Sequence, residues 1–169
     1  MTSTNNATDI MNSSAISQFS EIEIDGVVQP NVVTSYTFDT TGEHIVKYTL
    51  ADPTTIGTSA FYMRYNIRSV IIPNNVTSID NSAFGNCNGL TDVVLGSGLT
   101  NINTAFTDCY NLTNITSLAT TAPTIKNNTF QDIKSGGTLY VPNDSTGYDM
   151  WMGTDNYYLG SYGWNIVEQ

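Results

Sequence analysis

Side chains able to perform nucleophilic or metal chemistry are scarce in this sequence, which has one histidine, His44, and two cysteines, Cys87 and Cys109. His44 lies in a predicted hairpin with no Ser or Cys nucleophile motif nearby, so a catalytic triad or a His-based metal site has almost nothing to use. The two cysteines lack CxxC spacing, which argues against a zinc site. We therefore expect no catalytic residue, no bound metal and no cofactor.

Carboxylates are more plentiful, with 15 Asp and Glu residues. A glycosidase needs two carboxyl groups about 5 Å or about 6.5–9.5 Å apart, and calcium is a second alternative for an Asp- and Asn-rich chain. The acidic residues recur at predicted turns and solvent-facing positions, and no EF-hand spacing is present. These positions favour a solvated acidic surface over either site.

The charge and the hydrophobic content of the chain limit the classes of partner that it can bind. The 169 residues carry a formal net charge of −10, with 40% hydrophobic and 12% charged residues, which suits a folded domain with a real core. The five Lys and Arg residues are scattered, so nucleic acid and anionic membrane surfaces are poor partners. The apolar runs have only strand length and the first residues do not resemble a signal peptide, so we predict no membrane insertion.

The first third of the chain reads as two segments. Residues 1–18 are mostly Ser, Thr, Asn and small residues, which predicts a flexible leader. Residues 19–52 alternate polar and apolar side chains between turn residues, which predicts an antiparallel β-meander. Within it, residues 36–39 and 45–50 are expected to form a hairpin.

After Pro53 the sequence repeats. Six apolar positions of one copy recur 23 residues later in the next: Ile56, Phe61, Ile67, Val70, Ile72 and Val76 match Ile79, Phe84, Leu90, Val93, Leu95 and Leu99. A third copy begins at Ile102 and continues at a spacing of 22 residues, with Phe106, Cys109, Leu112 and Ile115. A fourth copy, containing Ile125, Phe130 and Leu139, is degenerate.

The first two copies contain the spacing Leu-x-x-Leu-x-Leu, as in Leu90, Val93 and Leu95, and in the third copy the last position is degraded to Ser117. A period of 20 to 29 residues with this core is the leucine-rich-repeat signature. The Ala-Phe pairs that precede it favour a short helical or 3₁₀ turn. We predict an α/β leucine-rich-repeat solenoid over residues 53–142, strand-rich with short helical turns and about four short coils. Val70, Val93, Ile115 and Leu139 should then be in register on neighbouring parallel strands.

Two strings carry a family resemblance: Val76-Thr-Ser-Ile-Asp-Asn-Ser-Ala-Phe-Gly-Asn-Cys-Asn-Gly-Leu-Thr-Asp-Val-Val-Leu and Gly137-Thr-Leu-Tyr-Val-Pro142. They resemble the BspA-like leucine-rich repeat of bacterial surface proteins. The resemblance implies a right-handed solenoid, an extracellular or cell-surface location, and a role in adhesion or protein binding. Arg64 departs from the pattern, because the second and third copies have Cys at this position.

Residues 143–169 are expected to cap the solenoid, since an array must cover its last coil. We predict a short helix over residues 144–152 and a strand over residues 164–167. Aromatic residues gather in this segment: Tyr148, Trp151, Tyr157, Tyr158, Tyr162 and Trp164. If exposed, their rings could stack on a sugar, so a glycan-binding module is an alternative function.

Strand alternation predicts a binding face. If the repeat aliphatics point inward, two columns of side chains point outward: Ser69, Ile71, Asp92, Val94, Asn114, Thr116, Thr138 and Tyr140. Cys87 and Cys109 occupy equivalent positions in successive copies, where a ladder of small buried side chains is favoured over a disulfide. The sequence thus favours a non-catalytic module that binds a protein or another host-surface macromolecule. A structural component of an appendage or virion is a further alternative.

Overall fold

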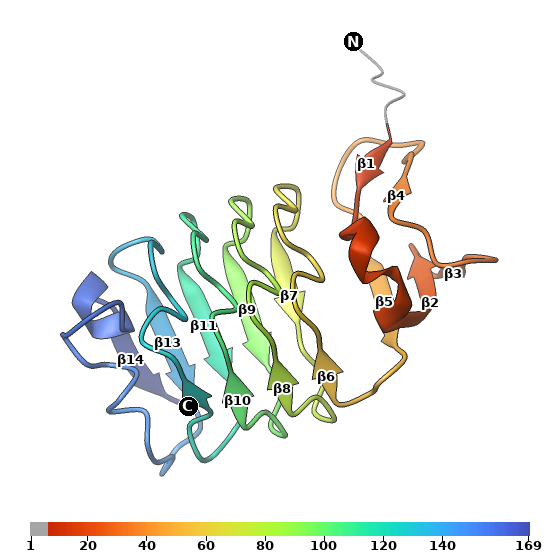
Figure 1. The fold of residues 1–169 in the computed structure, drawn as a ribbon. Helices are drawn as coiled ribbons and strands as arrows, with labels where there is room; N and C mark the ends of the chain where they lie inside the picture. Colours follow the sequence, from red (N-terminus) through yellow and green to blue (C-terminus); the bar gives the residue numbers. More distant parts are fainter. Residues whose placement is uncertain (1–6) are drawn as a thin grey trace.

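The structure is a computed structural model and describes residues 7–169 (Figure 1). A small N-terminal β-unit precedes a solenoid of stacked coils, as the repeat predicts. The N-terminal unit contains β1 (Thr8–Asp9), η1 (Ser13–Gln18), β2 (Phe19–Ile24), β3 (Val27–Val28), β4 (Ser35–Tyr36) and β5 (Val46–Leu50).

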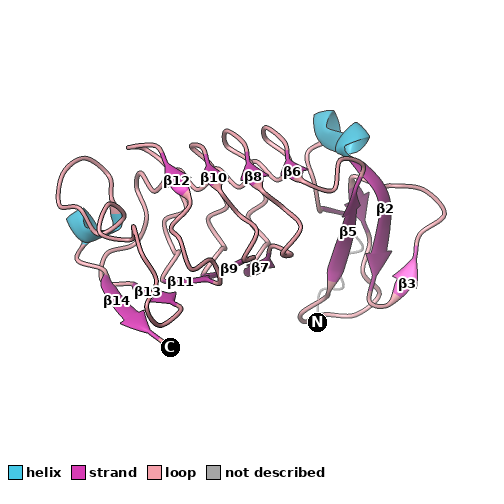
Figure 2. Cartoon of the chain, turned by 90° about the horizontal axis from the view of Figure 1, so that it is seen from below, coloured by secondary structure: helices cyan, strands magenta, loops and turns pink. Residues whose placement is uncertain are grey.

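Two parallel sheets form opposite sides of the solenoid (Figure 2). One consists of two-residue strands in the order β12-β10-β8-β6: β6 (Thr55–Ile56), β8 (Ser78–Ile79), β10 (Asn101–Ile102) and β12 (Thr124–Ile125). The other has the order β14-β13-β11-β9-β7: β7 (Ser69–Ile71), β9 (Asp92–Leu95), β11 (Asn114–Ser117), β13 (Thr138–Val141) and β14 (Asn165–Glu168). We call this second sheet the recognition sheet.

The predicted register is confirmed. Val70 pairs with Val93, Val93 with Ile115, and Ile115 with Leu139, all on parallel strands. Val93, Ile115 and Leu139 are buried, and Val70 in the first coil is half-buried. The strand-rich solenoid that the sequence predicts is therefore the observed fold, and the C-terminal segment adds a further strand to it.

A ladder of phenylalanines runs through the coils. Phe61 and Phe84 are stacked with ring centroids 5.1 Å apart, Phe84 and Phe106 with 5.4 Å, and Phe106 and Phe130 with 6.2 Å. These distances suit offset stacking of aromatic rings. Each Phe extends the core of the neighbouring coil, so the coils stabilise one another rather than folding alone.

Aromatic residues close both ends of this ladder. Phe19 and Tyr48 of the N-terminal unit pack on Phe61, with centroids 5.6 Å and 4.9 Å away. Trp151 packs on Phe130 at 5.3 Å. The N-terminal unit and the C-terminal segment therefore both act as caps of the solenoid.

The Ala-Phe segments form turns, not the helical turns that we expected. Two positions after each ladder Phe, the backbone is left-handed: φ is 60° at Met63, 60° at Asn86, 61° at Asp108 and 57° at Asp132. A left-handed residue ends a right-handed helix. Each turn is therefore cut short before a helix can form.

The predicted leader of residues 1–18 is wrong for residues 8–18, which form β1 and η1; residues 1–6 lie outside the described part of the chain. Met11 and Ala15 are almost fully buried against the first coil. Asn12 caps η1, its side-chain oxygen accepting a hydrogen bond from the Ser14 N–H at 3.1 Å. Two apolar residues four positions apart thus help to anchor this segment, together with the pairing of β1 with β4.

The predicted hairpin of residues 36–39 with 45–50 is also wrong. β5 pairs with β2, which pairs on its other side with β3, whereas β4 pairs with β1. Pairing with β2 aligns Ile24 with Val46 and Ile22 with Tyr48, and places Ile22 and Ile24 in a second small core. Burial of these side chains outweighs the closer sequence spacing of the expected hairpin.

The C-terminal segment differs from expectation in one element. Residues 144–152 form turns, because Asp144 (φ 58°) and Gly147 (φ 84°) are left-handed, and the only helical residues of this segment are those of η2 (Leu159–Tyr162). The expected final strand is present as β14, one residue later than predicted.

Candidate functional site

The candidate site is the outward face of the recognition sheet. The register places Ser69, Asp92, Asn114 and Thr138 side by side in one column, and Ile71, Val94, Thr116 and Tyr140 in a second. The residues between them along each strand point into the core. All eight predicted residues therefore share one face of one sheet.

β14 extends both columns. Asn165 pairs with Thr138, and Val167 pairs with Tyr140. The sequence did not place these two residues in the site, because Asn165 follows Thr138 by 27 positions and so falls outside the 22 to 24-residue repeat. The only available signal was the apolar pair Ile166 and Val167 next to a tryptophan.

The first column is polar and internally hydrogen-bonded. The Asn114 side-chain N–H donates to the Asp92 carboxylate at 2.9 Å, and the Thr91 hydroxyl donates to the other carboxylate oxygen. These bonds fix the Asp92 carboxylate on the face. The column therefore presents hydrogen-bonding groups at the interstrand spacing of about 4.8 Å.

The second column is mostly apolar. Ile71 is 76% exposed, Val167 is 42% exposed, and Val94, Thr116 and Tyr140 between them are half-buried. Burial of such an apolar stripe against a partner is favourable, because it removes apolar surface from water. A polar column beside an apolar one can bind a complementary surface. Neither column contains a nucleophilic side chain paired with a general base.

His44 lies in the N-terminal unit and not on this face. Its Nδ1 is 2.7 Å from the Asp25 carboxylate, its Nε2 is 3.1 Å from the Thr40 carbonyl, and its ring stacks on Phe38. The hydrogen bond to Asp25 raises the pKa of His44, and the same bond lowers the pKa of Asp25. The pair orders a loop, since Asp25 also accepts a hydrogen bond from the Ile45 N–H.

Both cysteines are buried free thiols. Cys87 donates to the Phe61 carbonyl and Cys109 to the Phe84 carbonyl, each at 3.1 Å, so each thiol bonds to the preceding coil. Burial raises the pKa of Cys87 to about 11 and raises that of Cys109 as well. These thiols are suited to packing rather than to nucleophilic chemistry, as the predicted ladder of small buried side chains requires. Within residues 7–169, no group of three or more His, Cys, Asp or Glu side chains could hold a metal ion.

Three of the six C-terminal aromatic rings are buried: Tyr148, Trp151 and Trp164. The Tyr148 hydroxyl donates to the Ala119 carbonyl at 2.8 Å, Trp151 Nε1 donates to the Pro123 carbonyl at 2.9 Å, and Trp164 Nε1 donates to the Lys134 carbonyl at 2.7 Å. Rings held in this way cannot stack on a sugar. They close the last coil instead.

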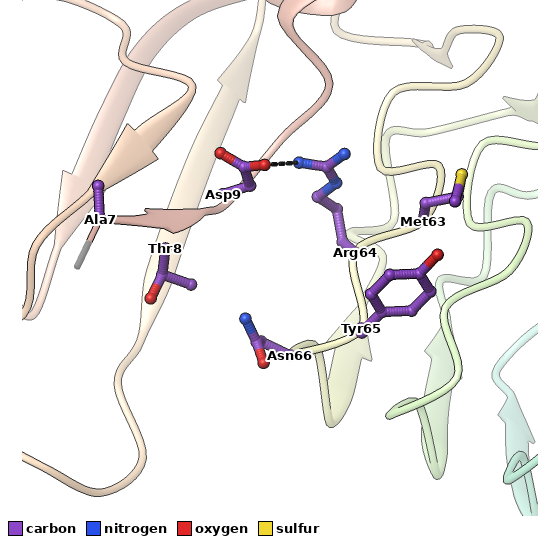
Figure 3. Close-up of a pocket in the computed structure, with 7 residues that line it drawn as sticks. All are labelled: Ala7, Thr8, Asp9, Met63, Arg64, Tyr65 and Asn66. Atoms are coloured by element: carbon purple, nitrogen blue, oxygen red, sulfur yellow. Dashed lines mark ion pairs between the residues drawn. The ribbon is translucent and has the colours of Figure 1, made fainter. Parts of the chain in front are cut away.

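A shallow pocket of about 510 Å³ lies where the N-terminal unit meets the first coil (Figure 3). Arg64 and Asp9 form an ion pair of 3.3 Å across its rim, and Tyr65 and Asn66 line the side toward β7. The pocket is polar and open. No sequence pattern indicated it, because its two sides lie more than 50 residues apart in the chain.

Comparison with known families agrees with this geometry. The BspA type leucine-rich repeat region matches residues 54–152 in six copies. The chain belongs to this family. The match confirms the resemblance of the repeat strings and continues ten residues past Pro142, into the C-terminal cap. Comparisons with curated proteins and with solved structures found no match.

Three general properties of the family bear on this chain. Leucine-rich repeats generally mediate protein binding, and their solenoids are typically non-catalytic. Proteins of this family are often surface-associated. Among the described residues, no helix has the length and apolar character needed to cross a membrane.

Proposed function

We propose that this chain is a non-catalytic extracellular or cell-surface module for protein binding or adhesion, and that it binds its partner with the outward face of the recognition sheet. The observation that carries this proposal is the register, which aligns Ser69, Asp92, Asn114, Thr138 and Asn165 beside Ile71, Val94, Thr116, Tyr140 and Val167. A repeat scaffold holds the backbone that carries such side chains at fixed spacing, which lowers the ordering cost of binding.

The charge of the chain selects the class of partner. A net charge of −10 repels polyanions and favours a neutral or basic protein surface. Apolar contact along the second column would supply affinity, and the fixed Asp92 carboxylate would supply orientation and specificity. Adhesion to a host-surface protein fits both requirements, and the frequent surface association of the family supports an extracellular location.

A double variant tests whether the outward face of the recognition sheet binds the partner. A binding screen against secreted and cell-surface proteins would first identify a partner, and Asp92→Lys with Tyr140→Ala would then alter both columns. We expect the affinity to fall by about tenfold or more, because each factor of ten needs only about 1.4 kcal/mol. Asp155→Lys with Tyr157→Ala makes the same chemical changes on the exposed C-terminal segment and should bind normally.

The outcomes separate the alternatives. Undiminished binding by a correctly folded Asp92→Lys, Tyr140→Ala protein would place the site elsewhere on the molecule. Loss of binding in the Asp155→Lys, Tyr157→Ala control alone would favour the C-terminal segment. Turnover of a glycan or peptide that a single carboxylate substitution abolishes would overturn the non-catalytic assignment.

A further inference from the structure

β7 is an open edge of the recognition sheet. The Arg68 carbonyl accepts a hydrogen bond from the Thr91 N–H at 2.9 Å, and the Ile72 N–H donates to the Val94 carbonyl at 2.8 Å. Successive residues of a parallel strand bond to opposite sides. The backbone N–H and C=O groups of Ser69 and Ile71 therefore point away from β9, and within residues 7–169 they have no hydrogen-bond partner.

None of the residues that the structure describes covers this edge. Ser69 is exposed, and Ile71, at 76%, is as exposed as any large apolar side chain in the described chain. Natural edge strands are often guarded by short length, Pro, an inward charge or a bulge. β7 is short, with three residues, but it contains no Pro, no inward charge and no bulge. The edge has the properties of a template for a further strand.

The N-terminal cap limits what can bind there. Phe19 and Tyr48 occupy the position over Phe61 that the aromatic ring of a preceding coil would take. A second solenoid therefore cannot stack on the first coil. A single extended strand needs only the edge itself, and Figures 1 and 2 both show β7 standing apart from β2 and β5.

We propose that β7 binds an extended peptide of a partner protein, which adds a strand to the recognition sheet. Backbone hydrogen bonds to Ser69 and Ile71 would hold it, as in other cases of strand addition. The peptide would carry β-branched or aromatic residues to cover Ile71 and no net negative charge, because the chain itself carries −10. The open pocket beside Tyr65 and Asn66 lies at the N-terminal end of β7 and can receive a flanking side chain.

The opposite edge, β14, is a weaker candidate. The Asn165 N–H donates to Gly137 and the Gln169 N–H to Val141, so Ile166 and Glu168 point outward there. Glu168 adds negative charge to that edge, and the pocket beside Tyr65 and Asn66 lies at the other end of the sheet. A peptide on β14 would contact the edge alone, whereas one on β7 also meets the N-terminal unit. Ser69 and Ile71 also belong to the outward face of the sheet, but this inference uses their backbone N–H and C=O groups, whereas the proposed function uses side chains along all five strands. Amide exchange at Ser69 and Ile71 therefore tests the edge separately from the face.

Amide hydrogen exchange measured by NMR tests the proposal directly. The probe is a synthetic peptide, Lys-Thr-Thr-Val-Val-Leu-Gly-Lys, which copies the strand sequence of the second coil with Thr for its Asp and a Lys at each end. At saturating peptide, exchange at Ser69 and Ile71 should slow about tenfold or more. Val70 should not change, because its N–H already bonds to β9. Absence of protection at millimolar peptide, or protection at Ile166 and Glu168 instead, overturns the proposal.

Edge variants give a second test. Ile71→Pro removes an outward N–H and leaves the bonds to β9, a substitution that edge strands tolerate, and it should weaken peptide binding about tenfold or more. Ile71→Thr keeps the N–H and should retain the protection of Ser69, and Ile166→Pro makes the matched change on β14 and should bind normally. Undiminished binding by folded Ile71→Pro overturns the proposal. If this variant does not fold, the exchange measurement on the unmodified chain decides.

Discussion

Phe84 is a buried residue inside the phenylalanine ladder, and its loss should destabilise the solenoid strongly. It lies in the second coil, is 2% exposed, and is stacked on Phe61 and Phe106 with interplanar angles of 7° and 6°. Truncation of a buried Phe to Ala costs about 3–5 kcal/mol through lost transfer free energy and a residual cavity. Both stacked partners belong to regular coils, so the cavity cannot collapse easily and we expect a value in the upper half of that range.

Urea denaturation of Phe84→Ala would measure this cost. The expected loss is severe against a total stability of about 5–15 kcal/mol. Tyr110→Ala is the matched control, because Tyr110 is a 50%-exposed aromatic residue of the next coil and its loss should change stability by less than about 0.5 kcal/mol. A loss below about 1 kcal/mol for Phe84→Ala would refute the ladder as the core of the solenoid.

Two further predictions use backbone strain and titration. Met63 is left-handed where the next coil has Asn86, so Met63→Asn should raise the free energy of unfolding by about 0.5–1 kcal/mol in urea melts, and Asn86→Met should lower it by a similar amount; opposite signs would contradict this reasoning. The raised pKa of His44 means that its contribution to stability is present below the ordinary histidine pKa and is lost as pH rises through the raised value, whereas the contribution of Asp25 is lost as pH falls through its lowered pKa. Asp25→Asn should therefore move the NMR titration midpoint of His44 down toward its ordinary value, and an unchanged midpoint would show that the hydrogen bond does not set it.

The repeat explains why the solenoid could be predicted from the sequence. Apolar residues such as Val93, Ile115 and Leu139 recur in one register, because a position that faces the core in successive coils must stay apolar. The outward face follows from the same register by alternation. The predictions of the solenoid and of its outward face use only the repeat period of the sequence. Each period corresponds to one coil of the folded chain.

The remaining differences come from contacts that the period does not encode. Residues 8–18 look unstructured because their apolar residues are few, yet Met11 and Ala15 cover the end of the core. The left-handed Asp144 was not evident from its residue type, so the expected cap helix was wrong. β14 joins the recognition sheet because the cap brings it there, with Trp164 buried behind it. Each of these elements lies at an end of the array, where a segment packs on a repeat without belonging to it.

Arg64 shows how the array accommodates its first coil. In the next two coils the equivalent residue is Cys, whose thiol donates to a carbonyl of the preceding coil. The first coil has no preceding coil, and Arg64 instead donates to the Met11 carbonyl at 3.3 Å and pairs with Asp9 at 3.3 Å. The arginine thus links the solenoid to residues 8–18 of the N-terminal cap.

Arg64→Cys tests this link. The bond from Arg64 to Met11 is partly buried, and a hydrogen bond from a charged group contributes about 1.5–3 kcal/mol. The ion pair should contribute little because the Asp9 side chain is 73% exposed. We expect Arg64→Cys to destabilise the chain by about 1–2 kcal/mol, with faster amide exchange confined to residues 8–18. Asp9→Ala should stay within about 0.5 kcal/mol of the parent. If the two variants cost the same, the ion pair and not the bond to Met11 holds the cap, and the analogy with the cysteine positions is wrong.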